Sequence, residues 1–134
     1  MRSLRSKHAF TLVEVMIVIA IIALLAAVAI PNFLRARKRA QATRILDDLR
    51  LIDGALDLYA TEGSKSAGDL AAWQDLQPYL KKNIQLYNSS GVDLLGNAFN
   101  GGAFSVDGVP RIHASSFAAL SDIAPAAFWS PFAP

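Results

Sequence analysis

The sequence predicts an α+β fold, in which a long N-terminal helix packs on a small C-terminal domain with short helices and an antiparallel β-meander. Three observations lead to this expectation. Residues 10–30 are almost uninterrupted apolar, with 19 of 21 side chains hydrophobic. Apolar residues then recur at helical spacing to about residue 61. Seven of the eight glycines and five of the six prolines follow residue 62, which is typical of turn-rich structure.

The amino-acid composition excludes several kinds of protein and of functional site. The chain has 134 residues, enough for one domain, and no cysteine. The absence of cysteine excludes a disulfide framework, a thiolate metal site and a cysteine nucleophile. The net charge of +2 hides an uneven distribution: residues 1–9 and 31–50 are basic, whereas residues 51–134 carry four basic side chains against eight acidic ones.

The segment 10–30 is long enough to span a bilayer as a helix, because about 20 residues cover the hydrocarbon core. It has two conventional interpretations, a secretory signal peptide and a plain membrane anchor. Ala27-Val28-Ala29 fits a signal cleavage site, but the segment exceeds the usual apolar region of about 7–15 residues. Neither interpretation explains Glu14, a carboxylate that is costly within hydrocarbon.

A third interpretation explains Glu14. If the chain is cut between Ala9 and Phe10, the new amino group of Phe10 lies one helical turn from Glu14. When such helices pack side by side with an axial stagger, Glu14 of one helix can neutralise the amine of its neighbour. Burying the pair costs less than burying either charge alone, so the carboxylate fixes the stagger.

Helical patterning continues beyond Pro31. One apolar stripe has alternating spacings of three and four residues and comprises Ala42, Ile45, Leu49, Ile52, Leu56 and Tyr59. We therefore expect one helix from Phe10 to about Thr61, roughly 78 Å long at 1.5 Å per residue. Its hydrophobic half should protrude, with a kink near Pro31, and Gly63 should end it.

The C-terminal domain is expected to contain short elements between turns. The predicted helices cover residues 70–80, capped by Asp69, and residues 117–123, capped by Ser116. The predicted strands cover residues 94–100, 103–106 and 109–113. The apolar end, residues 128–132, should pack back onto the domain. A core of this size is marginal alone, so packing against the amphipathic half of the long helix should stabilise it.

The N-terminal segment resembles the class III signal of type IV pilins and type II secretion pseudopilins. The resemblance rests on Lys7-His8-Ala9, Phe10-Thr11-Leu12-Val13-Glu14-Val15-Met16 and the run from Ala29 through Pro31 to Phe33. It implies a pilin-like fold, cleavage by prepilin peptidase between Ala9 and Phe10, and N-methylation of Phe10. One departure is Ala9, where that family usually has glycine.

The resemblance also implies a domain organisation and a location. Residues 1–9 would be a cleaved leader, 10–30 the transmembrane and filament-core half of the helix, 31–62 its amphipathic half, and 63–134 the globular domain. The subunit would cross the inner membrane once, with its C-terminal domain outside the cytoplasm, before entering a periplasmic pseudopilus or a surface filament. Its partners would be identical or homologous subunits, prepilin peptidase, the inner-membrane assembly platform and membrane lipid.

The sequence offers no catalytic constellation, so neither an enzyme nor a cofactor is predicted. His113 is the one histidine after the leader, which leaves too few groups for a catalytic or metal triad. Some pseudopilins bind calcium near the C-terminus, and Asp93 and Asp107 supply suitable oxygens. They lack a matching loop spacing, which favours turn capping over a metal site.

The densest charge run comprises Arg35, Arg37, Lys38 and Arg39. Beside a membrane helix these residues fit lipid headgroups, and in a filament they fit the acidic body of another subunit. No specific nucleic-acid contact is predicted. Positive charge normally stays on the cytoplasmic side, so a run placed outside conflicts with that rule.

The sequence leaves several functions open. The turn from Asp93 to Phe99 resembles the D-x-x-G-N-P-[YF] turn of major secretion pseudopilins, with Ala98 in place of proline, which favours a pseudopilin that drives protein export. The many Ala, Ser, Asn and Gly residues of the C-terminal domain would suit a surface pilin instead. A monomeric membrane-anchored binding module is the alternative from another class. An exported soluble protein would begin at Ile30.

Overall fold

The computed structural model describes residues 10–134 and confirms the α+β class. Its main element is helix α1, Leu12–Glu62, which contains 51 residues and continues through Pro31. The helix ends next to Gly63, as predicted. By internal contacts the chain divides into two units, Met1–Ala36 and Arg37–Pro134, and α1 contributes to both.

In the first unit, the apolar side chains of the described part of α1 are exposed. Phe10 is 84% exposed, and the large hydrophobic residues from Leu12 to Leu34 are each at least 48% exposed. By length and composition, α1 is the one helix among residues 10–134 that could cross a membrane. Such a continuous apolar surface requires a partner, either lipid or protein.

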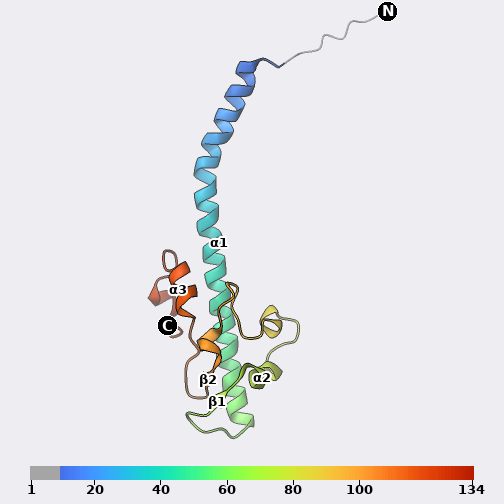
Figure 1. Cartoon of the computed structure of the whole chain (residues 1–134), viewed down its shortest axis with the longest axis vertical. Coiled ribbons are helices and arrows are strands. Elements are labelled where there is room, and N and C mark those ends of the chain that lie inside the picture. The colour runs from blue at the N-terminus through green and yellow to red at the C-terminus, as the bar shows by residue number, and fades with distance from the viewer. Residues whose placement is uncertain (1–9) are drawn as a thin grey trace, which may run out of the picture. The chain divides into compact units, whose positions relative to one another are not determined.

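The second unit has a closed core built on the C-terminal half of α1. The predicted stripe is confirmed, because Ala42, Ile45, Leu49 and Ile52 are all fully buried. Helical periodicity places these residues on one side, and the rest of the unit packs against that side. In Figure 1 the segments that follow α1 gather along this part of the helix.

The elements after α1 are short. In chain order they are β1 (Leu70–Ala71), α2 (Trp73–Leu76), the 3-10 helices η1 (Gln77–Tyr79), η2 (Gln85–Asn88) and η3 (Phe99–Gly102), β2 (Phe104–Ser105), α3 (Ala114–Leu120) and α4 (Ala126–Trp129). The described part of the chain has one sheet, in which β1 pairs antiparallel with β2. Ala71 lies opposite Phe104, and Phe104 is buried.

The predicted strands are confirmed in part. The strand expected at 103–106 contains β2, but residues 94–100 and 109–113 are not strands, and β2 pairs with β1 at Leu70 instead. A turn explains the first error: Asp93 N–H donates to Asn97 O at 2.9 Å, so the chain reverses within a few residues. One isolated antiparallel bridge, between Val92 and Ala98, closes this turn.

The predicted helices lie close to the observed ones, but their caps were assigned wrongly. Asp69 does not cap a helix over 70–80; its Oδ2 accepts from Ser66 N at 2.9 Å, and α2 begins only at Trp73. Helix α3 begins three residues before the predicted 117–123, and its N-cap is His113, whose Nδ1 accepts from Ser115 N at 3.2 Å. Ser116, the predicted cap, is buried inside the unit instead.

The C-terminal segment packs back as predicted. Trp129 is fully buried and Phe132 is 5% exposed. Trp129 Nε1 donates to Ala124 O at 2.9 Å, and Ile112 N donates to Phe132 O at 3.0 Å. The last residues therefore complete the core of the second unit.

Candidate functional site

The first candidate site is the N-terminal end of α1. Thr11 precedes the helix, and its backbone N–H and Oγ1 donate to Glu14 Oε2 at 2.8 and 3.0 Å. Glu14 N–H in turn donates to Thr11 Oγ1 at 3.2 Å. These reciprocal bonds form a capping box, which satisfies backbone donors that a helix N-terminus otherwise leaves unpaired.

The capping role of Thr11 was missed at the sequence level, although the signal was present. Thr11-Leu12-Val13-Glu14 is the T-x-x-E pattern that identifies a capping box. Both bonds to the Glu14 side chain end on Oε2, so Oε1 lies outside the capping box. Phe10, Glu14, Val15 and Val18 together line a shallow hollow of about 230 Å³. Glu14 thus combines a local cap with a position at an open apolar surface.

The predicted processing site lies partly outside the described residues. Ala9 is not described, whereas Phe10 is exposed immediately before the capping box. Pro31 lies within α1, where its ring removes one backbone donor. The kink expected there stays a prediction.

The basic run at residues 35–39 contains one side chain in an ion pair and three exposed arginines. Lys38 Nζ forms an ion pair with Asp122 Oδ2 at 2.8 Å. Arg35, Arg37 and Arg39 are exposed. Because Lys38 has a partner within its own chain, the contacts with lipid or other subunits predicted for this run fall mainly to the three arginines.

The two predicted calcium ligands lie in different loops. Asp93 is buried; its Oδ1 accepts from Leu95 N at 2.8 Å and Asn97 N at 3.0 Å, and its Oδ2 accepts from Ser116 Oγ. Asp107 Oδ1 accepts from Gly68 N at 2.9 Å and from Ser105 Oγ at 2.7 Å. Both carboxylates therefore hold loops in place. Among residues 10–134 no group of three metal-ligating side chains converges.

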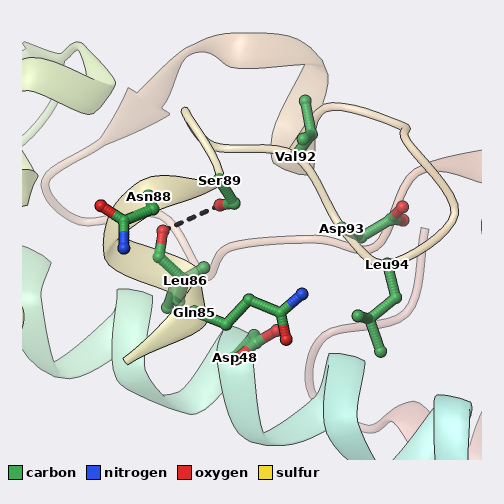
Figure 2. A pocket seen from close by; sticks show the side chains of 8 residues that line it. All are labelled: Asp48, Gln85, Leu86, Asn88, Ser89, Val92, Asp93 and Leu94. Atoms are coloured by element: carbon green, nitrogen blue, oxygen red, sulfur yellow. Dashed lines mark hydrogen bonds between the residues drawn. The ribbon is translucent and has the colours of Figure 1, made fainter. Parts of the chain in front are cut away.

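A pocket of about 290 Å³ with both polar and apolar lining was not anticipated from the sequence. Figure 2 shows that Asp48 of α1, Gln85 and Asn88 of η2, and Asp93 of the following loop line it. Burial raises the pKa of the Asp48 carboxyl above its ordinary value. The Arg44 guanidinium, whose Nε donates to Asp48 Oδ1 at 3.2 Å, offsets only part of this shift, and the charges of Asp47 and Asp93 add to it.

Replacing Asp48 with asparagine is expected to stabilise the second unit at pH 7, because the ionised carboxylate is held in a partly desolvated place. The pKa of Asp48 is higher in the folded protein than in the unfolded chain, so in the pH range between the two values the folded protein binds more protons. The wild type therefore becomes more stable as the pH falls through that range. The advantage of Asp48→Asn should therefore shrink toward about pH 4. Urea unfolding at the two pH values measures it, and a less stable variant at pH 7 would show that the Arg44 pair dominates.

Comparisons with known proteins point to the N-terminal site. A family model described as a prokaryotic N-terminal methylation motif matches residues 4–30. Type II secretion system core protein G of Klebsiella pneumoniae is 34% identical over 62 residues, which cover 46% of this chain and 44% of that protein. No solved structure matches the chain.

Pilus proteins are also among the relatives. The type IV wide pilus major component PilA4 of Thermus thermophilus is 44% identical over 69 residues, covering 52% of this chain and 53% of that protein. Type IV major fimbrial protein FimA of Dichelobacter nodosus is 36% identical over 64 residues, covering 48% and 40%. The chain thus spans about half the length of these relatives. The resemblance of the N-terminal segment to pilins and pseudopilins is confirmed.

Proposed function

We propose that this chain is a structural subunit of a type IV pilus-like filament, either a pilin or a pseudopilin. The observation that carries the proposal is the combination of a methylation motif over residues 4–30 with an apolar helix surface that no residue of the described chain covers. Before assembly, lipid covers this surface. In the filament, the same surface packs against the helices of identical or homologous subunits.

Processing creates the charge that Glu14 pairs with. Prepilin peptidase cuts between Ala9 and Phe10 and methylates the new amino group. The free subunit keeps Glu14 in the capping box with Thr11. In the filament, the Glu14 carboxylate neutralises the amine of a neighbouring subunit and so sets the axial stagger. The chemistry is done to this protein, and the protein itself supplies the assembly surface.

The membrane step follows from the same helix. Residues 10–30 cross the inner membrane with the C-terminal domain outside the cytoplasm, and the assembly platform extracts the subunit from the bilayer. The arginines at 35, 37 and 39 lie just beyond the apolar segment, where they suit anionic headgroups before assembly. After extraction they suit the acidic surface of residues 51–134 on another subunit.

The relatives include both secretion and pilus proteins, so the proposal names the filament subunit without choosing one system. A deletion strain distinguishes the two: loss of exported proteins from the medium identifies a pseudopilin, and loss of surface filaments identifies a pilin. A monomeric membrane-anchored module predicts neither loss, together with a single-subunit species after detergent extraction.

Mass analysis of the protein purified from membranes tests the processing step. The mature chain is expected to begin at Phe10 and to carry one added methyl group. Deleting the peptidase gene should restore the full-length mass. Intact Met1 in a functional, membrane-extracted protein would contradict the mechanism, and a mature chain that begins at Ile30 would identify an exported soluble protein instead.

A further inference from the structure

A second apolar surface lies on the second unit, at a groove between α1 and the segment that follows α2. Leu51, Gly54 and Leu58 line it from α1, and Tyr79 and Ile84 line it from the other side. Its volume is about 400 Å³. Leu51 and Leu58 remain 45% and 51% exposed, although the opposite side of the same helix segment is fully buried. The groove is thus an apolar feature that the core does not use.

Gly54 has no side chain, which leaves unoccupied space in this groove. A Cβ at this position would meet no atom within 4 Å, so no contact inside the subunit requires glycine. A glycine in a helix interior is less favourable than an alanine. Gly54 therefore lowers the stability of α1 although no contact within the subunit needs a glycine there. The space above Gly54 can instead accept a side chain from another molecule.

The rim of the groove is basic. Arg50 and Lys81 are among its lining residues, and Lys82 follows in the chain. Arg50 Nη1 contacts Asp47 Oδ1 at 3.2 Å, whereas Lys81 and Lys82 are exposed. An occupant that fits this groove is therefore an apolar side chain flanked by carboxylates.

The same chain carries such a feature at β1. Leu70 is 72% exposed, which is the highest value for a large hydrophobic residue between Arg37 and Pro134. Asp69 precedes Leu70 in the chain. Two hydrogen bonds hold Asp107 next to this segment: Gly68 N donates to Asp107 Oδ1 at 2.9 Å, and Val106 N donates to Asp69 O at 3.0 Å. The Ser105 hydroxyl and, to a smaller extent, the Gly68 N–H donate to the Asp107 carboxylate and lower its pKa.

We propose that Leu70 of one subunit inserts into the groove at Gly54 of a second copy of this chain, with Asp69 and Asp107 facing Lys81 and Lys82. Leucine supplies the apolar contact, and the charges select its orientation. The proposal rests on the proposed filament function and names the contact that the C-terminal domains make within it. In the proposed filament the contact repeats head to tail, so that Leu70 of each subunit enters the groove of the next and the assembly stays open. A reciprocal exchange between two copies would instead close a dimer.

A substitution that fills the groove tests the contact. Gly54→Leu places a side chain where Leu70 of the neighbour would insert, and it replaces the least favourable helix residue of the segment with a better one. We expect about tenfold less subunit in sheared filaments, while the Tm of the monomer in detergent is equal to or higher than that of the wild type. Gly54→Ala is the matched control: it makes the same helix correction with one methyl group and should assemble close to the wild-type level.

Cross-linking identifies the occupant. The chain has no cysteine, so Leu58→Cys combined with Leu70→Cys introduces the only two thiols. Oxidation of filaments with diamide should give a ladder of covalent multimers on a non-reducing gel, because each subunit bonds to the next. Leu70→Cys alone should give no multimers beyond dimers. The control pair Thr43→Cys with Leu70→Cys places the first thiol on an exposed position of α1 outside the groove and should give no ladder.

The outcomes distinguish failure of the proposed contact from failure of the proposed filament function. A ladder from the groove pair together with loss of assembly in Gly54→Leu supports the contact. If the Leu58→Cys, Leu70→Cys variant forms filaments at the wild-type level but gives no ladder, the proposal is overturned. Normal assembly of Gly54→Leu overturns it as well. Loss of assembly in Gly54→Leu without a ladder means that another occupant, such as a small apolar molecule, fills the groove, which also overturns it. Absence of wild-type filaments contradicts the proposed function instead.

Discussion

Glu14→Gln is expected to reduce filament assembly at least about a hundredfold while the processed subunit still inserts into the membrane. Glutamine is uncharged, so the buried amine of the neighbouring Phe10 loses its partner. Breaking a buried ion pair by removing one charge costs about 3–5 kcal/mol. Because about 1.4 kcal/mol corresponds to a factor of ten, that loss exceeds a hundredfold per contact.

Glutamine is chosen because it keeps the local structure. Thr11 N–H and Oγ1 both donate to Glu14 Oε2, and a glutamine side-chain oxygen accepts the same bonds. Thr11→Ala is the complementary variant. It removes the cap at a cost of about 1 kcal/mol and leaves the charge, so it should retain most assembly.

The measurement is the amount of subunit in sheared filaments relative to the membrane fraction, with mass analysis to verify cleavage before Phe10. Wild-type assembly of Glu14→Gln would contradict charge pairing. Equal losses in Thr11→Ala and Glu14→Gln would show that the helix cap, and not the charge, controls assembly.

The second large effect is expected from Trp129→Ala, which should lower the free energy of unfolding of the second unit by about 3–5 kcal/mol. Trp129 is fully buried in the core, and its Nε1 donates to Ala124 O at 2.9 Å. Its ring also stacks edge-on against Phe128, with 5.1 Å between ring centroids. A domain of this size has a total stability of about 5–15 kcal/mol, so the loss is a large part of it.

Thermal unfolding of the full chain in detergent measures this effect. The Tm should fall by about 12 °C or more, since each kcal/mol corresponds to about 4–8 °C in a domain of this size. Trp73, the other tryptophan, reports unfolding by fluorescence because its ring packs against Gly91 and Phe104. Phe128→Ala is the control, because Phe128 is only half-buried and should lower the Tm much less. A small change in Trp129→Ala would show that the C-terminal segment does not anchor the core.

Most of the candidate site at the helix N-terminus was predictable from the sequence. Phe10, Glu14 and the apolar run are local features, and an apolar segment of this length has few stable conformations other than a helix. Thr11 was overlooked, although its pattern with Glu14 is also local. The arginines at 35, 37 and 39 were predicted as an exposed basic run, but the partner of Lys38 lies 84 residues away and has no local signal.

The sequence by itself determined α1, including its buried stripe and its end beside Gly63, because helical hydrogen bonds and helical periodicity involve residues close in the chain. Only the tertiary structure decided the rest of the second unit. It paired Leu70 with Ser105, buried Ser116 against Asp93, gave the cap of α3 to His113 and left the groove at Gly54 open. The physical reason is that strands of two residues and helices of four are too short to be stable alone, so contacts between distant residues select them.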